Sequence, residues 1–298
     1  IDNRYSLDVT YYHKKTKDAL ISAIVPPSYG SSNSVRQNIG STQNTGFEVL
    51  INGQLIDRPN FGMDITINGS KNANKLISLG GTPPQIGSAT RAVEGYPMLA
   101  FWSQPIKSWN DANKDNIITV DEIVVDTAAS FKGYSAPRQF LGVTPGFDFL
   151  KKKLRLQALF DYRGGHLVYN NTERIRCVSR QNCMGWANPK SSFEEQAMVV
   201  GTLYHPTKTL DGFFQSGDFV KLRELSASYE LPNSWASLLK ARSARAIISG
   251  RNVWKHTLYR GVDNESDYTT TGGSDSVGGD FQTIGAPSYF TFRINVNF

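Results

Sequence analysis

The C-terminal segment, residues 290–298, constrains the fold of this chain more than any other part of the sequence. Its apolar residues alternate strictly with polar ones, at Phe290, Phe292, Ile294, Val296 and Phe298. Successive side chains of a β-strand point to opposite faces, so one face of this strand is an unbroken apolar row. Such a row either packs into the core of a soluble β-sandwich or faces lipid in a membrane β-barrel. The strand alone does not choose between these two folds.

The same alternation recurs along the chain and predicts an antiparallel, all-β fold. It occurs in segments 7–11, 47–52, 61–68, 154–163 and 225–231, and more weakly in 244–254. Three short connections separate neighbouring strands, at 57–59, 150–152 and 232–243, where a helical turn is expected through Trp235 to Leu239. The remaining connections are long: 14–43, 73–138, 164–215 and 255–287.

Short and long connections alternate along most of the chain, and this alternation favours the membrane barrel over the sandwich. Long loops without structure of their own are uncommon in compact soluble domains. Outer-membrane barrels, in contrast, have short periplasmic turns and long outer loops, and counting back from the C-terminus gives about eight strands. No run of residues approaches the ~18 apolar residues of a membrane-spanning helix, but barrel strands need only about ten alternating residues.

Composition and motifs argue against nucleic-acid binding and catalysis. The net charge is +6 over 298 residues, and the sequence contains no basic block typical of a nucleic-acid patch. The four histidines, His13, His166, His205 and His256, are scattered over loops and strand ends. No metalloprotease, hydrolase or phosphate-binding motif occurs. We therefore expect a protein that is not an enzyme.

Two cysteines, Cys177 and Cys183, lie close together in a polar stretch. A metal site is disfavoured because no histidine lies near them and two thiolates rarely suffice. Two unrelated reduced thiols remain an alternative. We favour a local disulfide, which implies an oxidising compartment such as the periplasm or the cell surface.

Residues 111–122 match the spacing of an EF-hand calcium loop. The expected ligands are Asp111, Asn113, Asp115, the carbonyl of Ile117, Thr119 or a water beside it, and Glu122. Asn116 replaces the usual glycine at the sixth position and is the next most tolerant residue for a left-handed backbone. A solvated, Asx-rich turn without metal is the alternative. The prediction is a structural Ca²⁺ that pins a long loop.

Several aromatic residues of the long loops are candidates for contact with a substrate or a covering protein. They are Trp102, Trp109, Trp186, Tyr204, Tyr259 and Tyr268. The alternative for each is packing within its loop or membership of an interfacial aromatic girdle.

Particular motifs add a family resemblance. They are Asp8–Asp18 with its Tyr-Tyr pair, Asn44-Thr45-Gly46-Phe47-Glu48, Gly217–Ser226, and Ser249-Gly250-Arg251-Asn252-Val253-Trp254. Together they resemble the C-terminal part of the SusC/RagA family of TonB-dependent outer-membrane transporters. One departure is Asp263-Asn264-Glu265, where relatives carry Asp-Pro-Glu, which leaves the detail of the last outer loop open.

The resemblance implies that residues 1–298 are the C-terminal part of a 22-stranded, plugged barrel. The plug domain and the TonB box precede the barrel in that family and are not among these residues. Eight strands of so wide a barrel should form an open, curved sheet. The implied function is import of glycans or peptides across the outer membrane, together with a SusD-like surface lipoprotein and with TonB acting through the plug.

The resemblance also implies that the barrel-assembly machinery reads the apolar row of 290–298 as a signal. Two alternatives remain at this point. One is a small, self-contained outer-membrane barrel that serves as an adhesin or porin. The other is a soluble, calcium-stabilised, carbohydrate-binding β-sandwich.

Overall fold

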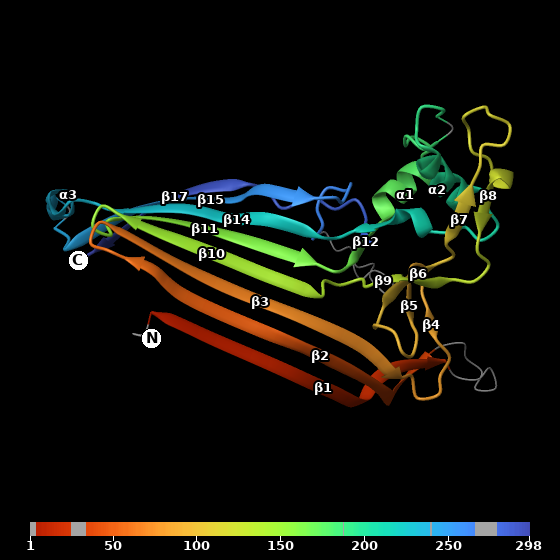
Figure 1. The fold of residues 1–298 in the computed structure, drawn as a ribbon, viewed down its shortest axis with the longest axis horizontal. Coiled ribbons are helices and arrows are strands. Elements are labelled where there is room, and N and C mark those ends of the chain that lie inside the picture. The colour runs from red at the N-terminus through yellow and green to blue at the C-terminus, as the bar shows by residue number, and fades with distance from the viewer. Residues whose placement is uncertain (1–3, 25–33, 187, 239, 266–278) are drawn as a thin grey trace.

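Eight long strands form one antiparallel sheet in the order β1-β2-β3-β10-β11-β14-β15-β17. The computed structural model describes residues 4–24, 34–186, 188–238, 240–265 and 279–298. Each long strand pairs with its neighbour in the chain order of this sheet, as Figure 1 shows. Their bounds are β1 Tyr5–Ile24, β2 Ser34–Asp57, β3 Phe61–Ser78, β10 Gln139–Phe149, β11 Leu154–Gly164, β14 Phe219–Glu230, β15 Ser243–Thr257 and β17 Tyr289–Asn297.

The register gives the sheet one apolar face and one polar face. Ile67 of β3 lies between Ile51 of β2 and Val143 of β10, and Val143 in turn pairs with Phe160 of β11. The next position, Asn68, faces the opposite side of the sheet because side chains alternate. The alternation read from the sequence is therefore confirmed across several strands.

The apolar face is not a sandwich core. Leu7 on β1 and Phe292 on β17 are 67 % and 66 % exposed, and Leu225 on β14 is 51 % exposed. Among the described residues, the hydrophobic clusters include Leu76, near the end of β3. Their other buried members lie in the connections and not in this apolar row. No second sheet covers the row among the described residues, which removes the soluble sandwich.

The sheet is open. Among the described residues, β1 pairs with β2 alone and β17 with β15 alone, so the two edge strands do not close a cylinder. The expectation of an open sheet is confirmed, and the small self-contained barrel is wrong for the part of the chain described.

Short turns lie at one end of the sheet and the long connections at the other, as Figure 1 shows. In the turn after β10, Leu150, Lys151 and Lys152 all have positive φ, which reverses the chain tightly. The third short connection contains α3 (Asn233–Leu238) where a helical turn was expected, and Leu239 lies outside the described residues.

The predicted bounds of the first long loop, 14–43, were wrong. Strand β1 continues to Ile24 and β2 begins at Ser34, with Thr16 paired to Thr42. On β1 the extra length begins with the polar residues 14–18 and continues with the mostly apolar residues 19–24, so neither part shows the strict apolar–polar alternation by which strands were recognised. For the same reason β3 runs to Ser78, beyond the predicted loop start at residue 73.

The other long connections fold into what we call the cap: residues 79–138, 165–218, 258–265 and 279–288. It contains small sheets and helices, so the expectation of unstructured loops was wrong. The elements are β4 Gln85–Ile86, β5 Thr90–Ala92, β6 Ala100–Ser103, β7 Ile106–Trp109, β8 Ile123–Val125, β9 Ser130–Gly133, β12 Leu167–Asn170, α1 Asn171–Val178, α2 Phe193–Leu203, β13 Phe214–Ser216 and β16 Gly279–Asp280. Single 3₁₀ turns lie at Val120–Glu122 and Asp211–Phe213.

Most of the buried hydrophobic core lies in the cap. Phe101, Tyr169, Val199 and Phe213 pack with both cysteines in one buried cluster. Segments far apart in the sequence thus hold each other, which gives the cap a core of its own. None of the described helices is long and apolar enough to cross a membrane.

Gly46 on β2 offers a direct test of how closely the first three strands approach. A Cβ at this position would lie 2.5 Å from the backbone oxygen of Lys71 and 2.6 Å from the Tyr12 hydroxyl oxygen. We expect Gly46→Ala to destabilise the protein by about 1–3 kcal/mol through this overlap, measured as the midpoint of denaturant unfolding. Gly69→Ala is the control, because its Cβ would meet Leu141 at 3.6 Å, an ordinary contact. Equal effects of the two substitutions would contradict the close packing.

Candidate functional site

The polar face of the sheet carries paired charges. Near the short turns, Arg155 on β11 donates to Asp64 of β3 at 2.8 Å and to Asp148 of β10 at 2.9 Å. Nearer the cap, a cavity of about 650 Å³ opens on this face, and its lining, which includes Asp161 and Arg223, comes from six strands. This cavity is lined by charges of both signs, so it suits polar rather than apolar ligands.

The last connection is anchored to the polar face by a buried lysine. Lys221 of β14 is 4 % exposed, and its Nζ donates to Asp263 Oδ1 and to Glu265 Oε2, both at 2.6 Å. Arg223, two residues further along the strand, donates to Glu265 and to Asp161 of β11. A buried ammonium is tolerated because two carboxylates surround it.

The tripeptide Asp263-Asn264-Glu265 therefore forms the loop side of this anchor. Between the two acids, Asn264 Nδ2 donates to the Gly217 carbonyl and to the Thr257 hydroxyl. Burial opposes ionisation of Glu265, but the hydrogen bonds from Arg223 and Lys221 and their positive charges outweigh it and hold its pKa at about 2. The tripeptide thus joins the end of β15 to the start of β14.

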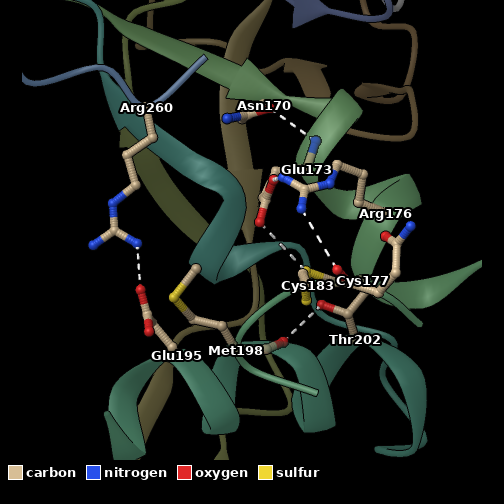
Figure 2. Close-up of a disulfide and its surroundings, with 10 residues drawn as sticks. Asn170, Glu173, Arg176, Cys177, Cys183, Glu195, Met198, Thr202 and Arg260 are labelled. Atoms are coloured by element: carbon tan, nitrogen blue, oxygen red, sulfur yellow. Dashed lines mark hydrogen bonds and ion pairs between the residues drawn. A yellow bond between two sulfur atoms is a disulfide. The ribbon is translucent and has the colours of Figure 1, made fainter. Parts of the chain in front are cut away.

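Cys177 and Cys183 form a disulfide, with Cα atoms 4.9 Å apart. Figure 2 shows it between α1 and the helix α2, with the Glu173–Arg176 ion pair on one side. Asn170 caps α1 by accepting from the Glu173 backbone N–H. Among the described residues, Glu173 and the two cysteines are the group of metal-ligand atoms lying within 4.8 Å of one another. Because the sulfurs are bonded to each other, this group does not offer thiolate ligands.

In the calcium-like loop, backbone amides already occupy several of the expected ligand oxygens. Asp111 accepts from the N–H groups of Asp115 and Asn116, and Asp115 accepts from Ile117. Glu122 closes the loop by accepting from the backbone N–H groups of Ala112 and Thr119. Asn116 has a φ of 66°, the left-handed conformation expected at the sixth position. The structure thus brings the predicted ligands onto one tight loop, and the presence of an ion stays a prediction.

Gln196 of α2 connects this loop to the core of the cap. It is 1 % exposed, its Oε1 accepts from the Ile118 backbone N–H at 2.8 Å, and its Nε2 donates to the Asn116 carbonyl at 3.0 Å. The same Nε2 lies 3.2 Å from the Asn188 carbonyl and 3.3 Å from that of Ser191. One amide therefore holds two segments, 116–118 and 188–191, against α2, and no local pattern predicts this role.

The predicted aromatic contacts have different surroundings. Trp186 stacks on Tyr204, with ring centroids 5.8 Å apart, and Tyr204 is exposed. Trp102 packs against Tyr96 and Phe131. Trp109 lies exposed on β7, and Tyr268 lies outside the described residues.

Tyr259 does not fit the expected role of an exposed contact. It is 5 % exposed, and its hydroxyl donates to Asp280 Oδ2 at 2.6 Å, inside the cap. The expectation that Tyr259 touches a substrate or a covering protein is wrong, because its side chain supports the fold of the last connection.

The row of the last strand lies on one face of β17. Phe290, Phe292, Ile294 and Phe298 are exposed and Val296 is half-buried. Phe290 covers Gly250 of β15, where a Cβ would come within 2.8 Å of its ring. An aromatic ring over a cross-strand glycine pins the register of these two strands.

Acid should weaken the anchor of the last connection. The pKa of Glu265 is lowered from about 4.5 to about 2, so its contribution to stability is present above about pH 4.5 and is lost as the pH falls towards 2. We expect Glu265→Gln to lower the melting temperature at pH 7 and to reduce its dependence on pH between 4.5 and 2. Glu194→Gln removes an exposed carboxylate on α2 and is the control. An unchanged pH profile in Glu265→Gln would refute this role.

Comparisons with known proteins were made for the chain as a whole. No family model matches it. Its curated relatives include TonB-dependent receptor P3 of Formosa agariphila, 25 % identical over all of this chain and 33 % of the receptor. Another is TonB-dependent receptor SusC of Bacteroides thetaiotaomicron, 22 % identical over 89 % of this chain and 28 % of SusC.

Solved structures give the same fold. The structure of the RagAB peptide transporter matches all of this chain and 34 % of its own, with a TM-score of 0.77 and 21 % identity. The "open-open" state of the RagAB peptide importer matches with a TM-score of 0.75. The chain spans about a third of the length of the relatives that it matches. It is therefore SusC/RagA-like, corresponding along its whole length to part of a TonB-dependent receptor.

Proposed function

We propose that this chain forms wall and cap of an outer-membrane, TonB-dependent importer of the SusC/RagA type. Its eight strands would be part of a 22-stranded barrel, with the apolar face towards lipid and the polar face towards the lumen. The protein would bind and pass its cargo rather than convert it.

One observation carries the proposal: a long sheet with a bare apolar face whose long connections all gather at one end. Backbone groups in hydrocarbon must be paired, which suits long strands that are paired along most of their length, with local register shifts after Leu159 and Leu222. The disulfide of the cap fits an oxidising outer side. The similarity of this chain, along all of its own length, to part of a TonB-dependent receptor supports the same assignment.

The proposed cargo is peptide in the first place and glycan in the second. The structural neighbours with the same fold are described as peptide transporters, while a curated relative is SusC. A RagB- or SusD-like surface lipoprotein would cover the cap, where Trp109 and the Trp186–Tyr204 pair offer exposed aromatic contacts. TonB would act through a plug, and the barrel-assembly machinery would read the row of β17.

A matched pair of substitutions tests the direction of the two faces. Ile67→Arg places a charge in the proposed lipid face, at a cost of about 2–4 kcal/mol near the bilayer midplane. Asn68→Arg places the same charge in the proposed lumen. We expect Ile67→Arg to reduce the folded protein in the outer membrane and the uptake of labelled peptides, and Asn68→Arg to preserve membrane insertion. Equal insertion of both variants, or recovery of the wild type in a soluble fraction, would overturn the proposal.

We propose in addition that the loop 111–122 binds a structural Ca²⁺. Three acidic side chains, the Asn113 amide, the Ile117 carbonyl and the Thr119 hydroxyl lie on one short turn, and Glu122 already closes it onto Ala112. Hydrogen bonds from the Thr119 and Ala112 backbones lower the pKa of Glu122, so it is a carboxylate at neutral pH. The ion would stiffen the turn between β7 and β8.

Calcium should therefore stabilise the protein. We expect a higher melting temperature in Ca²⁺ than in a chelator, about 2.7 kcal/mol of stabilisation at a hundredfold excess over Kd. Asp111→Asn should remove this difference. Asp121→Asn, an acid of the same loop outside the ligand positions, should keep it. A wild-type melting temperature that is the same with Ca²⁺ and with chelator would exclude the site.

A further inference from the structure

A second cavity, of about 490 Å³, opens in the cap between β5, β6, α1 and the segment that follows α2. Three cationic side chains line it, Arg91, Arg174 and Lys208, and none of its lining residues is acidic. Its volume falls within the range of small-molecule sites. We call it the basic pocket.

Among the described residues, no acid forms an ion pair with any of the three cations of the basic pocket. Arg174 Nε donates to the Asn171 side chain at 2.7 Å, and Lys208 Nζ donates to the Leu203 carbonyl at 2.6 Å, so both contacts are with neutral groups. The acids next to this region pair elsewhere: Glu173 with Arg176, and Asp211 with Lys132. Three like charges around one cavity repel one another, and an anion placed between them removes that repulsion.

The Trp102 side chain forms part of the wall of the basic pocket. The indole Nε1 of Trp102 is buried and has no hydrogen-bond partner among the described residues. Its ring is held between Tyr96 and Phe131, with centroid distances of 4.8 and 6.1 Å, so a change of ring orientation would disturb both contacts. The Trp102 ring is therefore a fixed part of the pocket wall, and its solvent-inaccessible Nε1 is not among the donors that face a ligand.

Resting on the proposed import function, we propose that the basic pocket binds the carboxylates of an acidic peptide. The planar guanidinium fork of arginine matches a carboxylate bidentately. The pocket volume is about 490 Å³, and one water occupies about 30 Å³ in the liquid. A single small inorganic ion would therefore leave most of the pocket empty. Val178, Leu210 and the Trp102 ring line part of the remaining wall, among Ser, Thr and Gln side chains, and suit the aliphatic part of an acidic side chain.

Binding of two labelled peptides to the detergent-purified protein tests this. One carries two adjacent glutamates and the other carries glutamines in their place, each with a rhodamine label. We expect the acidic peptide to bind at least about tenfold more tightly, with the difference shrinking as salt rises. Arg91→Gln and Arg174→Gln should each abolish most of this preference, and Arg174→Lys should retain part of it. Arg180→Gln, an exposed arginine just beyond α1, should leave it unchanged.

Equal binding of the two peptides, or a preference that survives both arginine substitutions, would overturn the proposal. Displacement of the labelled acidic peptide by a uronic-acid oligosaccharide or by inorganic phosphate, but not by the unlabelled acidic peptide, would also overturn it. Uptake of the neutral peptide is measured in parallel. If Arg174→Gln imports the neutral peptide normally, the import function stands whichever way the acidic preference falls.

Discussion

The backbone ladder of the eight-stranded sheet is the constraint on which the rest of the molecule depends. Because side chains alternate along each strand, one register sets both faces at once, and a slip of one residue would exchange them. Ile67 lies beside Ile51 and Val143 only in this register. Phe290 over Gly250 and the close approach at Gly46 leave little room for another. The polar lining and the position of every cap segment follow from that choice.

The cap depends on the sheet through charge and on itself through packing. Lys221 ties the last connection to β14, so the cap cannot shift without breaking a buried ion pair. The buried cluster around Phe101 and Phe213 then holds together two connections, the one between β3 and β10 and the one between β11 and β14. Charges of both signs line the strand face, whereas positive charge alone lines the basic pocket. The two cavities therefore select differently among ligands.

Local patterns were readable from the sequence, and contacts between distant segments were not. Alternation located seven of the eight long strands, whereas β10 was implied only by the short turn at 150–152, and the extension of β1 over 14–24 was missed because it lacks strict alternation. Spacing alone identified the loop 111–122 and the pairing of Cys177 with Cys183 as candidates. The sequence shows basic residues on the strand and acidic residues in the loop that form the Lys221–Glu265 pair. Which of these residues pair with each other could be known only from the folded structure. Tyr259 was misjudged because an aromatic loop residue gives no sign of its burial.

Gln196 has a consequence for how strongly the loop 111–122 can hold a cation. Two hydrogen bonds fix the orientation of its side-chain amide, with the oxygen towards the Ile118 N–H and the nitrogen towards the Asn116 carbonyl. The turn is thereby preorganised, and the entropy of closing it is lost when the cap folds rather than when an ion arrives. Affinity would then be partly a property of α2, a helix that contributes no ligand. The same twelve residues cut out as a peptide would be a poorer binder, although every coordinating oxygen would still be present.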